Sequence, residues 1–261
     1  MNSLTMNALT IVKVGGKIVE EPQSLKQLLI DFSKIEGNKV LVHGGGRSAT
    51  AIAAKLGIES TMVNGRRVTD EETLKVVTMV YGGLVNKQIV AGLQAVGVNA
   101  LGLTGADLNY MQSEKRPVNE VDYGFVGDVK AVNAGILAEL IAKGVVPVLA
   151  PLTHDMCGNM LNTNADTIAA EAAKALTQYF DVTLMYSFEK KGVLMNESDE
   201  ESIIPELTPD LFKQYVASGI ISAGMIPKLE NAFEAIKAGV KQVIITRADL
   251  IHTSGGTKII E

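Results

Sequence analysis

The 261-residue sequence has one cysteine, no tryptophan and three histidines. Because Cys157 is the only cysteine, an intrachain disulfide and a thiolate metal site are excluded, and a reducing compartment is favoured. His43, His154 and His252 lack metal-ligand spacing, and no Ser–His–Asp set can be argued from them. We therefore expect no metal held by protein side chains.

Excess basic charge and long apolar runs are also missing. The net charge of −5 and the pI near 5.4 argue against nucleic acid as the main partner. No segment reaches about 18 uninterrupted apolar residues, and residues 1–10 do not resemble a signal peptide, so we expect a cytoplasmic protein without a membrane partner. Hydrophobic residues make up 47% of the chain, which is enough for a large core.

Short β-branched runs alternate with amphipathic helical patterns along the chain. This alternation predicts an α/β fold, a three-layer αβα sandwich around a mostly parallel sheet. Two lobes, 1–174 and 175–261, are expected to meet near the helix predicted at 165–176. The polar stretch 110–129 predicts hairpins outside the main sheet. The strands are predicted at 9–14, 39–42, 99–103, 145–150, 182–186, 242–246 and 257–260.

Three consecutive glycines, Gly44, Gly45 and Gly46, follow a predicted buried strand and precede a helix. Their N–H groups and the positive end of that helix suit phosphate or carboxylate oxygens. The sequence fits neither a Walker loop nor the dinucleotide fingerprint. A tight strand–helix turn explains the glycines equally well.

Two lysines and two polar segments are further candidates. Lys13 interrupts an apolar strand, and burying an ammonium is costly unless it is paired or functional. Lys228, near a helix start, is by itself more typical of an ordinary solvated lysine. Asn162, Asn164 and Asp166 alternate on one side of an extended backbone, although helix capping accounts for one of them. Arg66-Arg67 offers a guanidinium for a carboxylate, or two solvated loop arginines.

Together these segments resemble N-acetylglutamate kinases, members of the amino acid kinase (carbamate kinase-like) superfamily. The resemblance covers essentially the whole chain, and the Asn-Gly-x-Arg-Val-Thr and Asn-x-Asn-Ala-Asp patterns are its most specific parts. The matching segments are Lys13-Val14-Gly15-Gly16, His43-Gly44-Gly45-Gly46, Asn64-Gly65-Arg66-Arg67-Val68-Thr69, Asn162-Thr163-Asn164-Ala165-Asp166, Gly224-Met225-Ile226-Pro227-Lys228 and Gly256-Thr257-Lys258-Ile259.

The resemblance implies a transferase of arginine biosynthesis that uses ATP to phosphorylate the side-chain carboxylate of an N-acyl-L-glutamate, with Mg²⁺ held mainly by ATP. The first lobe would hold the acyl-glutamate and the second lobe ATP. The implied catalytic residues are Lys13 and Lys228, with Asp166 orienting both lysines. The implied substrate-binding residues are Gly44, Gly45, Arg67, Asn162 and Asn164. The implied nucleotide-binding residues are Gly15, Gly16, Glu189, Gly192, Leu194, Ile220 and Ser222.

The segment Phe188-Glu189-Lys190-Lys191-Gly192-Val193-Leu194 departs from the family's usual Thr/Ser-Asp-Val-x-Gly-Val-Leu, with Glu189 at the usual Asp. The segment 104–109 also differs from the family's usual Ser-Gly-x-Asp-Gly pattern. The polar hairpin region after it is expected to shape the acyl pocket, so the acyl group need not be acetyl. Arginine-inhibited members have an extra N-terminal helix. Because the first strand is expected by about Leu9, we expect a homodimer without arginine feedback, its interface including the long helix from Asp70.

Two alternatives stay open. One is a kinase of another small acid, such as aspartate or carbamate, within the same superfamily. The other is a catalytically silent sensor of nucleotide or amino acid, which the altered segment after Phe188 motivates.

Overall fold

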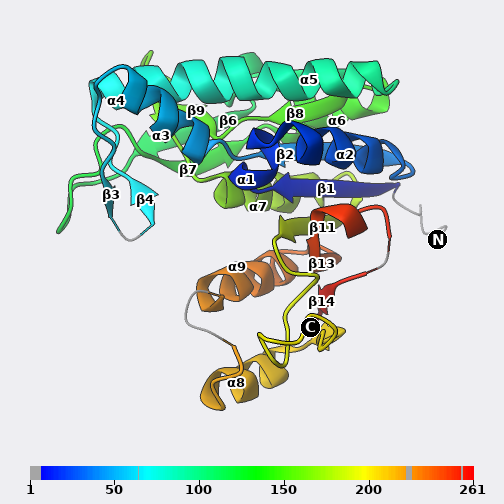
Figure 1. Cartoon of the computed structure of the whole chain (residues 1–261). Helices are drawn as coiled ribbons and strands as arrows, with labels where there is room; N and C mark the ends of the chain where they lie inside the picture. The colour runs from blue at the N-terminus through cyan, green and yellow to red at the C-terminus, as the bar shows by residue number, and fades with distance from the viewer. Residues whose placement is uncertain (1–6, 64, 222–224, 254) are drawn as a thin grey trace.

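In the computed structural model, which describes residues 7–63, 65–221, 225–253 and 255–261, one eight-stranded sheet runs through the molecule (Figure 1). Its order is β12-β14-β13-β11-β1-β2-β8-β5, and only the β13–β14 pair is antiparallel. The strands are β1 (Ala8–Val14), β2 (Asn38–His43), β5 (Ala100–Leu103), β8 (Val146–Leu149), β11 (Asp181–Phe188), β12 (Glu206–Leu207), β13 (Gln242–Arg247) and β14 (Thr257–Ile259).

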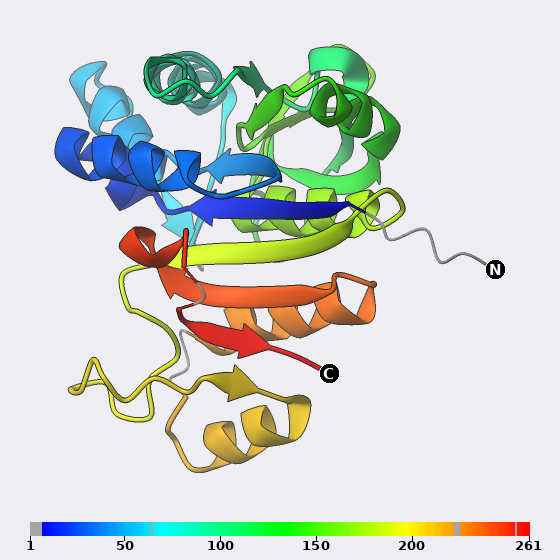
Figure 2. The ribbon, with the colours of Figure 1, turned by 90° about the vertical axis from the view of Figure 1, so that its right-hand side faces the viewer.

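Helices cover both faces of this sheet, which gives the predicted three layers (Figures 1 and 2). One apolar core lies between the sheet and the first group of helices, and the second core lies on the opposite face. The first group is α1 (Gly16–Glu20), α2 (Pro22–Ser33), α3 (Gly46–Lys55), α4 (Glu71–Val77) and α5 (Asn86–Ala95). The second is α6 (Ala134–Ala142), α7 (Ala165–Leu176), α8 (Pro209–Ala217) and α9 (Ile226–Lys237).

A smaller four-stranded sheet lies outside the main one, as the polar stretch 110–129 predicted. Its order is β10-β9-β6-β7, with antiparallel pairing of β6 with β7 and of β9 with β10. The strands are β6 (Met111–Lys115), β7 (Gly127–Val132), β9 (Leu152–His154) and β10 (Met160–Asn162). A third, two-stranded sheet joins β3 (Met62–Val63) to β4 (Arg66–Arg67). Two short helical turns, η2 (Asp107–Asn109) and η3 (Ala248–Leu250), complete the elements.

The long helix runs without interruption from Glu71 to Ala95, with a π-helical segment η1 (Thr78–Val85) in its middle. Thr69-Asp70-Glu71-Glu72 matches the capping-box pattern with Thr69 as N-cap, but the N-cap is Asp70, whose carboxylate accepts a hydrogen bond from the Thr73 N–H at 2.8 Å. This helix is long and apolar enough, by length and composition alone, to cross a membrane, and 44% of its most apolar stretch is buried in the fold.

The sheet order bears on the predicted division into lobes. The main sheet divides between β1 and β11. The strands of residues 8–149 form the half that includes β1, and the strands of residues 181–259 form the half that includes β11. The predicted boundary at 174 falls inside α7, which contacts both β1 and β11. The division into two lobes therefore stays a prediction.

Candidate functional site

Two glycine turns lie side by side at the carboxyl ends of β1 and β2. Because the two strands are parallel neighbours, Gly15 and Gly16 after β1 meet Gly44 and Gly45 after β2. A Cβ on Gly44 would lie 3.2 Å from the Gly16 amide nitrogen, and one on Gly45 would lie 2.9 Å from a carbon of the Tyr81 ring. The glycines are thus needed for close packing as well as for access to backbone N–H groups.

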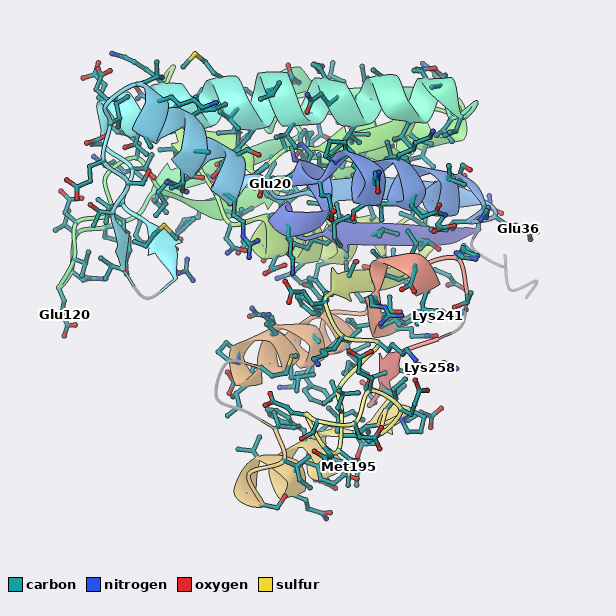
Figure 3. The ribbon with its side chains drawn as sticks, in the orientation of Figure 1. Glu20, Glu36, Glu120, Met195, Lys241 and Lys258 are labelled. Carbon is teal, nitrogen blue, oxygen red and sulfur yellow. The ribbon has the colours of Figure 1, made fainter. Side chains whose placement is uncertain are left out.

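The second turn feeds directly into the N-terminus of α3. Its N-cap, Gly45, has no side chain that can cap the helix. The carboxylate of Glu20, labelled in Figure 3, instead accepts a hydrogen bond from the Ser48 N–H at 2.7 Å. The Gly46 and Arg47 N–H groups, which precede Ser48 in the first turn and have no partner within the helix, can bind an anion beside the glycines.

Lys13 and Asp166 form an ion pair at the same edge of the sheet. The Lys13 Nζ lies 2.7 Å from the Asp166 Oδ1, and their side chains are 10% and 28% exposed. Asp166 lies in the first turn of α7, whose N-cap is Asn164 with its side chain accepting from the Asp166 and Thr167 N–H groups. No well-directed hydrogen bond reaches this buried Asp166 oxygen among the described residues, so the contact is mainly electrostatic.

Lys228, in the first turn of α9, lies near Lys13 and Asp166 and lines the same cavity as they do. Its ammonium lies 4.2 Å from the centroid of the Phe188 ring, whereas the Lys13 ammonium lies 5.7 Å from it. The sequence implied that Asp166 orients both lysines, but within the described ranges Asp166 pairs with Lys13 only. Lys228 and Asp166 nevertheless line the same cavity.

This cavity, which we call the lysine cavity, has a volume of about 520 Å³. Its lining carries five basic and two acidic residues, so it suits a ligand with several negative charges. The charged members are Lys13, Lys17, Arg47, Lys190, Lys228, Asp166 and Glu189, and the glycines are Gly15, Gly16, Gly46 and Gly192.

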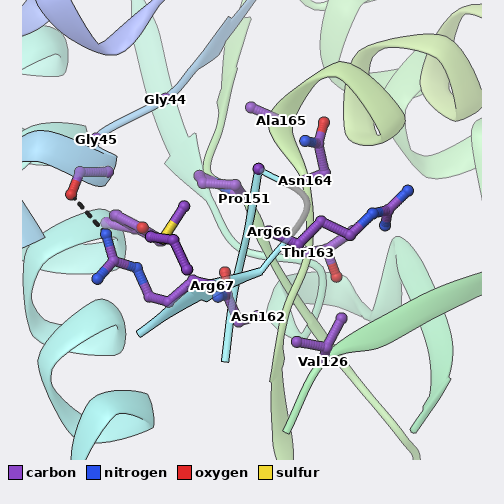
Figure 4. A pocket seen from close by; sticks show the side chains of 14 residues that line it. Gly44, Gly45, Arg66, Arg67, Val126, Pro151, Asn162, Thr163, Asn164 and Ala165 are labelled. Atoms are coloured by element: carbon purple, nitrogen blue, oxygen red, sulfur yellow. Dashed lines mark hydrogen bonds between the residues drawn. The ribbon is translucent and has the colours of Figure 1, made fainter. Parts of the chain in front are cut away.

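A second cavity of about 190 Å³, the arginine cavity (Figure 4), shares Gly46 with the lysine cavity. Arg67 is 8% exposed there, and its guanidinium donates to the Gly46 carbonyl, the Thr50 hydroxyl and the Ser60 hydroxyl, each at 2.8 Å. All three acceptors are neutral. The positive charge of Arg67 is therefore fixed in place without being neutralised, which prepares it for a carboxylate.

Asn162 faces the arginine cavity from β10. Its Nδ2 donates to the Thr69 hydroxyl at 2.9 Å, and that hydroxyl donates to the Arg67 carbonyl oxygen at 3.1 Å. Asn162 also forms a β-bridge with Val126, the residue before β7. The small outer sheet therefore closes this side of the cavity. Gly44, Gly45 and Asn164 complete the predicted substrate-binding set in its lining.

The predicted nucleotide-binding residues are only partly brought together. Glu189 lies in the lysine cavity with its carboxylate 3.0 Å from the Lys17 ammonium, and this hydrogen bond lowers the pKa of Glu189. Leu194 and Ile220 lie outside the cavity lining; Leu194 is buried and bridges to Ile203. Their nucleotide contact stays a prediction. Ser222 lies outside the described residues.

His43 lies behind the glycine turn and is fully buried. Burial lowers its pKa to about 4, because an imidazolium there would lose its hydration. Its Nδ1 lies 2.7 Å from the Gly44 carbonyl oxygen and its Nε2 lies 3.1 Å from the Asn86 Nδ2, which also donates to the Val148 carbonyl. The neutral ring thus supports the turn and lies outside both cavity linings.

The sequence did not predict the side chains that contact Arg67 and Lys228. Thr50 and Ser60 fix Arg67, but Thr50 lies in α3 and Ser60 in the loop before β3, and their approach to Arg67 depends on the tertiary fold. Phe188 had a signal: on β11 it alternates with Tyr186, which pairs with Lys13 across the β1–β11 ladder. Because side chains two residues apart on a strand point to the same face of the sheet, the Phe188 ring lies on the same face as Lys13.

The family of the chain follows from its similarity to known proteins. The model of the amino acid kinase family matches residues 8–247. The acetylglutamate kinase of Parabacteroides distasonis is 73% identical over 97% of this chain and 100% of its own length. That of Cytophaga hutchinsonii is 54% identical over 98% and 99%.

Solved structures show the same fold. Carbamate kinase from Giardia lamblia bound to AMP-PNP aligns over 99% of both chains with a TM-score of 0.71 at 17% identity. N-acetylglutamate synthase from Neisseria gonorrhoeae, complexed with coenzyme A and N-acetyl-glutamate, aligns over 97% of this chain and 59% of its own with a TM-score of 0.81 at 21% identity. With its full-length relatives and its family model in agreement, this chain belongs to the amino acid kinase family.

Proposed function

We propose that the protein is an ATP-dependent N-acyl-L-glutamate kinase that phosphorylates the side-chain carboxylate of its substrate, a step of arginine biosynthesis. The observation that carries the proposal is the junction of the two cavities at one pair of glycine turns. The arginine cavity accepts the acyl-glutamate and the lysine cavity accepts the phosphates of ATP. Gly46 lines both cavities, so the two reacting groups meet there.

Arg67 would bind the α-carboxylate of the substrate. Its guanidinium is buried, charged and held by three neutral acceptors, so a carboxylate becomes its only anionic partner. Asn162 and Asn164 would bind the amide and neighbouring oxygens. The side-chain carboxylate then points at the glycines, whose N–H groups can hold oxygens of the reacting groups.

The nucleophile needs no general base. A free glutamate carboxylate has a pKa of about 4.3 and is ionised at neutral pH. The difficulty is repulsion, since this carboxylate must approach a polyphosphate of the same sign. Lys13 and Lys228 supply the opposing charge, and Asp166 fixes the first of them.

Mg²⁺ would be held mainly by phosphate oxygens of ATP and would add to this neutralisation. The described part of the chain contains no group of three or more His, Cys, Asp or Glu side chains able to hold a metal by itself. The two carboxylates of the lysine cavity, Asp166 and Glu189, each lie against a lysine. This arrangement fits a metal that arrives with the nucleotide.

The acyl group is set by the wall of the arginine cavity. Its lining, drawn from the described residues, has no acidic side chain and two arginines. Arg67 would bind the α-carboxylate of the substrate, whereas Arg66 is exposed at the rim of the arginine cavity. An acyl group that ends in its own carboxylate would meet Arg66, and an acetyl group would leave it unused. The substrate panel must therefore include N-succinyl-L-glutamate beside N-acetyl-L-glutamate.

The test is acyl-phosphate formation with MgATP, trapped by hydroxylamine as a hydroxamate. Product from an N-acyl-L-glutamate, with none from aspartate or carbamate, supports the proposal. Product from another small acid alone would assign the chain to the second kinase class. Binding of ATP without turnover of any substrate would favour the sensor, against which the Lys13–Asp166 pair and Lys228 already argue.

We also propose a cytoplasmic homodimer that pairs through the long helix, with the acyl-glutamate lobe at 1–174 and the ATP lobe at 175–261. The outer face of η1 supports the interface, because Met79 and Leu84 are 55% and 44% exposed. Analytical ultracentrifugation of wild type and Leu84→Glu tests it. A dimer that the charged variant converts to monomer is expected, and a monomeric wild type would contradict it.

A further inference from the structure

Lys228, the second lysine of the phosphoryl site, lies over an aromatic ring. The Lys228 side chain is exposed, and its ammonium forms no ion pair within the part of the chain that the structure describes. It lies 4.2 Å from the centroid of Phe188, well inside the range of a cation–π contact of about 6 Å.

The Phe188 ring is itself fixed in orientation. It stacks on Tyr186, two residues earlier on β11, with centroids 6.0 Å apart and planes only 10° from parallel. Tyr186 is 3% exposed and pairs with Lys13 across the strand ladder. The ring is therefore part of the sheet's rigid face, whereas Lys228 reaches it from the start of α9.

A ring beside Lys228 differs electrostatically from a carboxylate. A second carboxylate beside Lys228 would hold its ammonium, but it would also cancel the charge that the transferring phosphoryl group requires. The face of an aromatic ring attracts an ammonium through its quadrupole and carries no net charge. Because Asp166 pairs with Lys13, the positive charge of Lys228 stays uncompensated among the described residues.

We infer that Phe188 is a positioning residue that holds Lys228 toward the phosphates of ATP by a cation–π contact. The inference rests on the proposed kinase function and deepens it at the same site. Without the ring, an exposed lysine samples rotamers that point away from the cavity. The fraction of enzyme ready for nucleotide then falls, and the apparent affinity for MgATP falls by the same factor.

A fluorination series tests this inference with little change of shape. Phenylalanine carrying one, two or three ring fluorines is introduced at position 188, because each fluorine weakens the negative face of the ring. The matched control is the same series at Phe180, a buried phenylalanine of the core that lies outside the lysine cavity. Initial rates are measured against MgATP at saturating acyl-glutamate, and Tm is recorded for every protein.

The KM for MgATP should rise stepwise with fluorine count at position 188, by about fivefold at three fluorines, with kcat within about twofold of wild type. The Phe180 series should be flat. Phe188→Tyr should retain wild-type KM, and Phe188→Leu should raise KM at least as much as three fluorines do. A flat series at 188, or equal changes in both series, would overturn the inference while the kinase function stands. An inactive wild type would instead remove the proposed function itself.

Discussion

Replacing Lys13 by methionine is the most direct test of how the site works. The change removes one ammonium and keeps a side chain of similar length in an almost fully buried position. An ammonium aimed at developing negative charge in a water-poor site contributes on the order of 3–4 kcal/mol to the transition state. We therefore expect kcat to fall by about 10²–10³, with a smaller change in KM for the acyl-glutamate.

The fold should survive this substitution. Burying an ammonium is costly, so its removal relieves a penalty, while the Asp166 carboxylate loses its partner. Because the Asp166 side chain is 28% exposed, water can hydrate it in the variant. The two effects oppose each other, so we expect the free energy of unfolding to change by less than about 2 kcal/mol. Urea unfolding followed by circular dichroism measures it.

Lys39→Met is the matched control on the neighbouring strand. Lys39 lies at the opposite end of the sheet and donates to three carbonyls at the end of α2, those of Phe32, Ser33 and Ile35. Its loss should cost about 1–3 kcal/mol of stability and leave the hydroxamate rate within about twofold. Lys13→Met with activity within tenfold of wild type, while Lys39→Met behaves as expected, would refute the role of Lys13.

Three further predictions concern the glycine turn and its neighbours. Arg67→Lys should raise the KM for the acyl-glutamate by about 10²-fold with kcat less affected, because an ammonium cannot donate to three fixed acceptors and grip a carboxylate in two places; equal KM values would contradict it. Gly45→Ala should cost about 1–3 kcal/mol in urea unfolding and most of the activity, because its Cβ meets the Tyr81 ring; unchanged stability would refute the packing argument. The pKa of His43, lowered to about 4, means that the unfolded chain binds the extra proton between pH 6.5 and 4, so stability falls as pH falls. Between pH 7.5 and 5 this group should account for roughly 2 kcal/mol, a difference that His43→Gln should abolish.

The layers of the fold followed from the sequence because local patterns and packing agree there. The helix predicted at 165–176 is α7, and the strands predicted around Lys13 and His43 are β1 and β2. Where the structure differs, a tertiary contact decides. Thr69 matches the capping-box pattern, but its hydroxyl links Arg67 to Asn162, and Asp70 caps the helix instead.

The candidate site was predictable only in its principal groups. Lys13 was predictable because it is a charged residue in an apolar strand, and the triple glycine predicted a backbone turn. The contacts of Lys228 with Phe188 and of Arg67 with Thr50 and Ser60 could not be predicted, because they depend on how loops and helices pack in the folded chain. The structure pairs Asp166 with Lys13, and the predicted orientation of Lys228 by Asp166 stays a prediction.

One electrostatic rule connects the two cavities. Arg67 is held by two hydroxyls and a carbonyl, and Lys228 by a ring, so neither cation is neutralised by its support. Among the described residues, Lys13 is the one of the three that pairs with a carboxylate, and this pairing offsets the cost of burying its ammonium. Neutral supports leave positive charge available for anions that must be brought together against their repulsion. A site built for a neutral substrate would gain nothing from this arrangement, which is why the charge pattern argues for joining a carboxylate to a polyphosphate.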